Sequence, residues 1–351
     1  MLIGINYPWI DYGWDFGPPP RWVADDSLPA WRARKRRQIE EDFSQFASLG
    51  FFAVRWFLLA DGTNYGMAEF APKKTGDDWT FAPLPCGHPF YDQLRDDFAF
   101  VLHTCSQNGM KFFPSLIDFH WCGQGSVLEN NPVIIKGGRY DIVRDPAIRN
   151  AFFERVLDPL LEASAQYPNS IYAWELINEP ERVIRKFSLF GKRDGNRNVR
   201  LQEMREFIAE GVSHINAKLL PTGGSAFRSS VGFAHWNSLH KWDSQKLGIT
   251  LPQFHYYAQE NCALPPHPSS ACYPCVLGEF ATAMERDWPD LKNLRMDQTV
   301  ANRLCCIEQK GYPACFLWSA KAMDPSTRWA ESEHREVIAY TRSNSADSLQ
   351  G

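Results

Sequence analysis

Several features that mark other protein classes are missing from this sequence of 351 residues. It has no apolar run that approaches the roughly 20 residues needed to cross a bilayer. Neither sign of charge dominates, because 37 basic residues are balanced by 41 acidic ones and the net charge is -4. The first absence argues against a membrane protein, and the second gives no reason to expect a nucleic-acid partner. With 44% hydrophobic and 22% charged residues, the composition is that of an ordinary globular protein.

Motifs for bound phosphates, cofactors and metals are missing as well. There is no Gly-rich phosphate loop, no Gly-x-Ser-x-Gly elbow, and no visible cluster of Asp, Glu and His with metal-ligand spacing. We therefore expect neither a cofactor nor a catalytic metal. The nine cysteines are odd in number and scattered, which favours reduced thiols. One cluster, Cys262, Cys272 and Cys275 with His267 nearby, leaves a zinc site or one disulfide open.

The first seven residues are too few for a signal peptide and have the pattern of a strand. We therefore expect a cytoplasmic protein, or a secreted one if a signal segment has been removed. The basic run at 32–37 lies at the start of a helical pattern, where a solvated helix face is the expected reading. The sequence does not indicate an oligomeric state.

Short apolar runs alternate with longer amphipathic segments, which is typical of strand–helix units and a parallel sheet. Eight strands are predicted, at residues 2–7, 53–59, 111–117, 171–177, 229–233, 253–257, 275–278 and 314–318. Eight such units form a (β/α)8 barrel, for which about 250 to 400 residues suffice. We predict an α/β protein with a single TIM-barrel domain over residues 1–351. Roughly the last ten residues are expected to form a disordered tail.

Helices are predicted between most of the strands, at residues 33–49, 91–108, 146–166, 199–219 and 297–310. The segments 234–252 and 258–274 are rich in proline and histidine and show poor helical periodicity. Long insertions follow three strands, at residues 61–89, 121–144 and 182–198. Because the loops after the strands carry the site of such a barrel, these insertions are expected to shape a cleft.

Two glutamates stand where apolar strands end. Glu179 follows the run Trp174-Glu175-Leu176-Ile177-Asn178 and precedes Pro180, and Glu279 follows Val276-Leu277-Gly278. A carboxylate that ends a buried strand is costly unless it is paired or functional. In the predicted barrel both glutamates are directed to the same mouth. Glycoside hydrolysis needs such a pair, one protonated to release the leaving oxygen and the other, in retaining enzymes, attacking the anomeric carbon.

With these motifs, the sequence resembles clan A of the glycoside hydrolases, and most of all glycoside hydrolase family 5, which includes cellulases and mannanases. Asn178-Glu179-Pro180 matches that family's acid/base motif, and Glu279 matches its nucleophile. The resemblance extends to other strand-end residues, namely Arg55, His120, His255, Tyr257 and Trp318.

The resemblance implies a role for each of these residues. Arg55 and Tyr257 would hold the nucleophile Glu279, and Asn178 would donate to the sugar 2-hydroxyl. His120 and His255 would bind substrate hydroxyls or tune the acid. Trp318 would be a stacking floor, with core packing as the alternative.

The predicted function is therefore that of a retaining β-glycoside hydrolase acting on β-linked gluco- or manno-configured oligosaccharides or polysaccharides. A transglycosylase with the same carboxylates, or a catalytically silent carbohydrate-binding barrel, remains an alternative. Glu175 is expected to be a structural buried carboxylate, with an arginine as its candidate partner. Four further tryptophans are candidate sugar platforms or core residues: Trp9, Trp14, Trp79 and Trp121.

Overall fold

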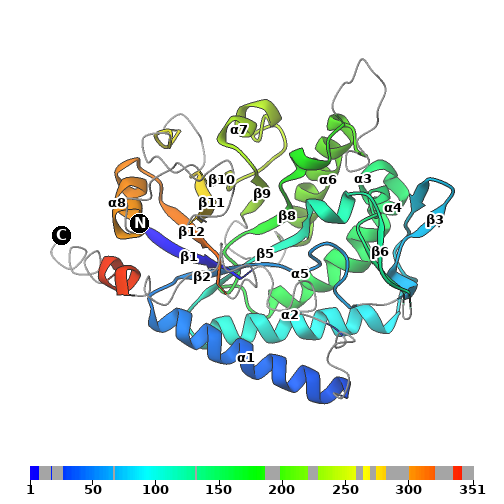
Figure 1. The fold of residues 1–351 in the computed structure, drawn as a ribbon, viewed down its shortest axis with the longest axis horizontal. Helices are drawn as coiled ribbons and strands as arrows, with labels where there is room; N and C mark the ends of the chain where they lie inside the picture. The colour runs from blue at the N-terminus through cyan, green and yellow to red at the C-terminus, as the bar shows by residue number, and fades with distance from the viewer. Residues whose placement is uncertain are drawn as a thin grey trace.

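A closed barrel of eight parallel strands, surrounded by helices, is the centre of the molecule (Figure 1). The structure is a computed structural model, which describes residues 1–7, 17, 27–65, 68–130, 133–185, 198–219, 228–257, 264–268, 274–281, 300–320 and 335–341. Around the barrel the strands follow the order β1, β12, β11, β10, β9, β8, β5, β2. This confirms the predicted (β/α)8 barrel.

The eight barrel strands lie close to their predicted positions. They are β1 Leu2–Asn6, β2 Ala53–Phe57, β5 Lys111–Asp118, β8 Trp174–Asn178, β9 Ser229–Phe233, β10 Gln253–Tyr256, β11 Val276–Ala281 and β12 Ala314–Trp318. Two differences bear on the site. The strand predicted at 171–177 begins only at Trp174 and runs on to Asn178, and the strand predicted at 275–278 continues to Ala281, so that Glu279 lies within β11.

Side chains alternate between the inside of the barrel and its helix-covered surface, as the pleat of a strand requires. In β2, Val54 and Trp56 join the large outer core, whereas Ala53 and Phe57 belong to small clusters on the other side of the strand. Arg55 shares this inner side, and its side chain is completely buried. The barrel interior therefore contains an arginine between two apolar layers.

The described helices cover the outside of the barrel. They are α1 Leu28–Ser48, α2 Pro89–Gln107, α3 Asp141–Arg144, α4 Pro146–Phe152, α5 Asp158–Ala165, α6 Leu201–Leu219, α7 Trp236–Trp242 and α8 Val300–Gln309. α1 begins earlier than predicted because the Ser27 hydroxyl accepts from the Ala30 N–H and a proline follows in the first turn. None of the described helices is long and apolar enough to cross a membrane.

Two helical segments differ from prediction. The helix predicted at 146–166 is divided into α4, a π-helical turn Phe153–Leu157, and α5. Pro159 lies just beyond this turn, and a proline within a helix removes one backbone hydrogen bond and clashes with the preceding turn. The segment 234–252, which shows poor helical periodicity, contains α7, whose seven residues are too few to show a clear period.

The insertions after β2 and β5 form two hairpins on one side of the barrel (Figure 1). They are β3 Lys73–Thr75 with β4 Asp78–Thr80, and β6 Ser126–Asn130 with β7 Val133–Lys136. The buried Arg139 connects the two insertions, since its guanidinium donates to the carbonyl oxygens of Gly62 and Gly137 at 2.8 Å each. It also stacks on Trp121, 5.0 Å from the ring centre.

Candidate active site

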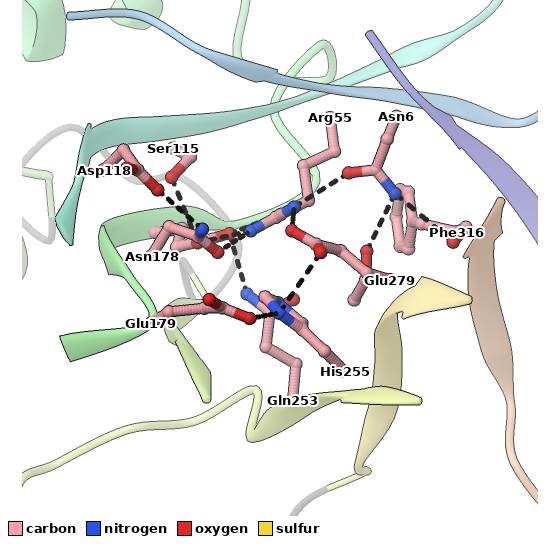
Figure 2. Close-up of polar contacts among 12 residues, drawn as sticks. Asn6, Arg55, Ser115, Asp118, Asn178, Glu179, Gln253, His255, Glu279 and Phe316 are labelled. Carbon is pink, nitrogen blue, oxygen red and sulfur yellow. Dashed lines mark hydrogen bonds and ion pairs between the residues drawn. The ribbon is translucent and has the colours of Figure 1, made fainter. Parts of the chain in front are cut away.

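The two predicted glutamates come together at the ends of β8 and β11 (Figure 2). Both are buried, with 6% of Glu179 and 3% of Glu279 exposed. His255, from β10, lies between them: its Nδ1 is 2.8 Å from Glu179 Oε1 and 3.3 Å from Glu279 Oε2. One oxygen of each glutamate and a ring nitrogen of His255 all lie within 4.8 Å of one another.

The backbone at Glu179 turns sharply to bring its side chain into this group. Its φ of 45° and ψ of 51° are left-handed, a conformation that residues other than glycine rarely adopt. The turn is held at both sides, because the Glu179 N–H donates to Gly232 O at 2.6 Å and Pro180 begins the short 3-10 helix η4, Pro180–Val183. Such strain is typical of functional positions whose surroundings fix the backbone.

Glu279 is held by the two groups that the resemblance implied. Arg55 Nη1 donates to Glu279 Oε1 at 2.9 Å, and the Tyr257 hydroxyl donates to Glu279 Oε2. Burial raises the pKa of Tyr257 well above its usual value, and the charge of Glu279 adds to this effect. Tyr257 therefore remains protonated and able to donate near neutral pH.

Arg55 is the centre of a larger polar network inside the barrel. Its Nε and Nη2 donate to the two oxygens of Glu175 at 2.7 Å each, which makes Glu175 the buried, arginine-paired carboxylate that was expected. Arg55 also donates to Asn178 Oδ1 at 2.7 Å and to Asn6 Oδ1 at 2.8 Å. A buried guanidinium in this geometry neutralises two carboxylates and fixes both in place.

Three members of this network were not singled out from the sequence. Asn6 Nδ2 donates to the Gly278 carbonyl at 3.0 Å, next to Glu279. Ser115 and Gln253 donate to the oxygens of Glu175 at 3.0 and 2.8 Å. The signal available in the sequence was a polar residue within an otherwise apolar strand, because such a residue must find a partner inside the barrel.

Glu179 has hydrogen-bond partners on both carboxylate oxygens. His255 contacts Oε1, and Arg182, three residues further along η4, donates through Nε to Oε2. Burial raises the pKa of Glu179, but His255 and Arg182 outweigh this effect and bring its pKa down to about 2. Arg182 was not recognised as a site residue from the sequence, which placed it at the start of an insertion.

The electrostatics of Glu279 differ from those of Glu179. Burial raises the pKa of Glu279, and the opposing charges of His255 and Arg55 do not cancel that rise. A general acid must carry a proton, and the contacts of Glu179 with His255 and Arg182 oppose its protonation in this arrangement.

Asn178, at the end of β8, and His120, just after β5, extend the site around Asp118, the last residue of β5. Asn178 Nδ2 donates to Asp118 Oδ2 at 2.8 Å, and the other Asp118 oxygen contacts the His120 ring. The His120 side chain is 38% exposed and lies at the rim, bonded to Asp118 rather than to the two glutamates. The contact with Asp118 orients its ring, so His120 is placed to meet a ligand that enters from solvent.

The tryptophans are mostly covered by protein. Trp318 is 8% exposed, and its ring centre lies 6.2 Å from that of Phe57. Trp121 is completely buried and Trp79 is 6% exposed. Trp121 is therefore a core residue, and most of the Trp79 side chain is packed against protein. Trp9 and Trp14 lie outside the described residues.

The close approach of Glu179, His255 and Glu279 also has the spacing of a metal site. No such spacing is visible in the sequence, because the fold brings together residues from three separate strand ends. Protein donors already bond to these carboxylates, however, and Arg55 and Arg182 supply positive charge beside them. We therefore assign none of the three as a metal ligand.

The cysteine cluster considered from the sequence is only partly described. Cys275 is a buried free thiol, and His267 Nε2 accepts from its backbone N–H at 2.9 Å rather than facing its sulfur. Cys262 and Cys272 lie outside the described residues. The described part of the cluster thus shows neither a disulfide nor a zinc-binding arrangement.

Solved structures of three β-mannanases share this fold. An endo-1,4-beta-mannanase from Eisenia fetida has a TM-score of 0.66 and 17% identity, covering 97% of this chain and 90% of its own. A beta-1,4-D-mannanase from Cryptopygus antarcticus has a TM-score of 0.67 and 16% identity, covering 97% and 90%. A beta-mannanase from the blue mussel Mytilus edulis has a TM-score of 0.64 and 18% identity, covering 97% and 91%.

The sequence itself matches no family model and no curated protein. At identities of 16 to 18%, the likeness to the three solved structures is one of fold. The chain therefore has the same barrel architecture as these β-mannanases along nearly its whole length.

Proposed function

We propose that the protein is a retaining β-glycoside hydrolase in which Glu179 is the acid/base and Glu279 the nucleophile. The observation that carries the proposal is the approach of the two glutamates, whose nearest oxygens lie within 4.8 Å of each other at the mouth of the barrel. Carboxyl groups about 5–5.5 Å apart are typical of retaining enzymes, whereas inverting enzymes separate them by about 6.5–9.5 Å. The spacing leaves no room for a water between the sugar and the second carboxylate.

The assignment of roles follows from the partners of each glutamate. Glu279 is held from two sides by Arg55 and Tyr257, which fix a carboxylate for attack at one position. Glu179 shares His255 with Glu279 but has its second oxygen directed toward the half-exposed Arg182. The acid/base needs such access, since it must meet first the leaving oxygen and then a water.

In the first step, the Glu179 carboxyl gives its proton to the glycosidic oxygen while a Glu279 oxygen attacks the anomeric carbon. The glycosidic bond breaks, the leaving sugar departs as an alcohol, and a glycosyl ester forms on Glu279. In the second step, the Glu179 carboxylate takes a proton from water, whose oxygen displaces Glu279 from the anomeric carbon. The two inversions return the β-configuration.

A β-1,4-linked mannan is the first substrate to test, because the solved structures of similar fold are β-mannanases. Mannopentaose would be incubated with the protein and its products followed by NMR. We expect the β-anomer of the new reducing end to be seen first. Early appearance of the α-anomer would contradict the retaining mechanism, and binding without cleavage would favour a carbohydrate-binding barrel.

The two roles are separated with an activated aryl β-mannobioside and added azide. Glu279→Ala should lose turnover of both the aryl glycoside and mannopentaose, and azide should restore turnover with an α-glycosyl azide as product. Glu179→Ala should lose about 10²–10⁴-fold on mannopentaose but keep a rapid first step on the activated glycoside, which needs little protonation. With this variant azide should give the β-glycosyl azide.

Glu206→Gln is the matched control, because Glu206 is an exposed glutamate on α6, and its turnover should equal that of the wild type. If Glu279→Ala keeps wild-type turnover, or if the two variants give azides of the same configuration, the assignment of roles is wrong.

A further inference from the structure

Arg182 contacts the Glu179 oxygen that His255 does not contact. It lies on η4, its Nε donates to Glu179 Oε2, and its guanidinium carbon is 5.3 Å from the centre of the Phe119 ring. Because His255 contacts the other oxygen, each oxygen of Glu179 already has a hydrogen-bond partner from a basic side chain. An acid whose oxygens both accept hydrogen bonds from cationic groups is held as an anion.

The two arginines of the site differ in how firmly they are held. Arg55 is completely buried and makes five hydrogen bonds to four different side chains. The Arg182 side chain is 53% exposed, and the structure gives it Glu179 and the face of Phe119 as partners. Because the Arg182 side of this ion pair is half-exposed, a ligand arriving from solvent reaches the guanidinium while the Glu179 carboxylate stays buried.

The charged and titratable groups around this contact come from every strand end that faces it. Arg182 is close enough to Asp118 and Glu279, in addition to Glu179, for their charges to act on it. Glu179 has His255 on its buried side, and the Tyr257 hydroxyl and Glu279 lie beyond His255. Of these groups, only the cation of Arg182 combines contact with Glu179 and substantial exposure.

We propose that Arg182 is a positioning residue that keeps Glu179 as a carboxylate while the site is empty and is displaced by the sugar on the leaving-group side. The proposal rests on the proposed function, since it concerns how the acid of that reaction becomes competent. Once the guanidinium leaves, Glu179 keeps its buried surroundings and the contact with His255, and its free oxygen faces the glycosidic oxygen. Protonation of Glu179 is thereby linked to occupancy of the leaving-group side.

The first test needs no activity. The δ-carboxyl carbons of ¹³C-glutamate-labelled protein would be titrated by NMR, with Glu179→Gln identifying the Glu179 signal. In Arg182→Met, which keeps the unbranched stem over Phe119 but removes the charge, we expect the Glu179 pKa to rise by about 1–3 units. Arg185→Met removes the same charge from the same segment and should leave the Glu179 titration where it is in the wild type. An unchanged Glu179 pKa in Arg182→Met overturns the proposal.

The second test compares pH profiles on mannopentaose. The basic limb of kcat/KM reports the pKa of the acid in the free enzyme, and the basic limb of kcat reports its pKa in the substrate complex. In Arg182→Met the limb of kcat/KM should move to higher pH, because the free acid holds its proton longer, while the limb of kcat stays in place. Limbs that move together, or not at all, contradict displacement by substrate. If mannopentaose is not cleaved, the proposed function fails on this substrate while the carboxyl titration still decides the role of Arg182.

Discussion

At the scale of single residues, Arg55 determines more of the site than either glutamate. It neutralises Glu175 and Glu279 at once and anchors the amide of Asn178. Removing one partner of a buried ion pair leaves a charge that neither water nor protein can stabilise. The stability of the barrel interior and the position of the Glu279 carboxylate therefore depend on the same side chain.

Arg55→Met should lower the free energy of unfolding by about 3–5 kcal/mol, because two buried carboxylates lose their cation. Urea unfolding followed by tryptophan fluorescence measures this loss. Arg95→Met is the control, since Arg95 lies on the surface of α2 with 47% of its side chain exposed, and it should cost less than about 1 kcal/mol. Equal losses in the two variants would show that the network contributes no special stability.

His255 makes stability depend on pH. Burial lowers the pKa of His255, but the charges of Glu279 and Glu179 raise it overall, so the folded protein binds this proton more tightly than the unfolded chain. The resulting stabilisation is fully present below the unfolded pKa of about 6.5 and is lost as pH rises through the folded pKa. The difference in unfolding free energy between wild type and His255→Asn should therefore be larger at acidic than at alkaline pH.

Chemical denaturation across this pH range checks the trend, with His240→Asn, an exposed histidine of α7, as control. If the difference in unfolding free energy between wild type and His255→Asn grows with pH, the folded protein holds His255 in its neutral form.

Sequence reasoning named Glu179, Glu279, Arg55, His255 and Tyr257 as candidates, and the fold brings these five residues together. Their proximity was predictable because strand ends in a parallel barrel meet at one mouth. It missed Arg182, whose contact depends on the left-handed turn at Glu179 rather than on a strand end. The local pattern after Pro180 has no recognisable signature of such a turn.

At the scale of secondary structure, β9 allows the polar network to approach its backbone closely, because Gly232 has no side chain. A Cβ atom at Gly232 would lie 2.6 Å from Glu175 Oε1, 2.8 Å from Asn178 Oδ1 and 3.0 Å from Arg55 Nη2. These atoms belong to the central network and are held on several sides. Glycine is needed here for close approach, since its φ is not left-handed.

Gly232→Ala should reduce kcat at least 10-fold, because the added methyl group displaces the Arg55 network and a misplacement of about 1 Å costs up to 10²-fold. Turnover of mannopentaose is the measurement. Gly76→Ala, in the β3–β4 turn, is the control for destabilisation away from the site, since its Cβ meets nothing within 4 Å but its φ of 63° strains an alanine. Wild-type turnover in Gly232→Ala would show that the network tolerates a shift.

The two hairpins depend on Arg139, which ties the insertion after β2 to that after β5. Arg139→Met would leave the carbonyl oxygens of Gly62, Ile135 and Gly137 without this donor. Each unsatisfied buried group costs about 1–3 kcal/mol. We expect limited proteolysis to cut within residues 61–89 or 121–144 before the barrel is degraded, whereas Arg144→Met, on the ring of Tyr140, should be cut like the wild type.

The barrel strands were predicted better than the elements outside them. Buried parallel strands appear as continuous apolar runs bounded by turns, and these runs identified all eight. The exposed hairpins carry no comparable pattern, because β3 and β6 are mostly exposed. Their formation depends on the Arg139 contacts, which connect segments far apart in the sequence.

At the scale of the whole molecule, one apolar core links the barrel to the last described helical residues, 335–341. Val337 is completely buried in this core, and the Tyr340 hydroxyl donates to Glu308 of α8 at 2.7 Å. This short segment therefore covers the outside of the barrel beside α8. Its attachment is part of the stability of the whole fold.

Val337→Ala should lower the unfolding free energy by about 1.5 kcal/mol, since it removes roughly two buried methylene equivalents. Thermal unfolding should show a single transition shifted to lower temperature, because the core is shared. An early, separate transition would mean that residues 335–341 unfold on their own. Arg335→Ala, at the exposed start of the segment, is the control.

The left-handed backbone at position 179 lowers the stability of the fold for as long as a glutamate is kept there. Such a conformation costs a residue with a Cβ atom about 1–3 kcal/mol, whereas glycine adopts it freely. Under the proposed role of Glu179, a descendant of this gene released from selection for catalysis would gain stability by drifting to glycine at this position, and one still under selection would keep glutamate. The residue found at this position in a relative of known activity therefore tests that role.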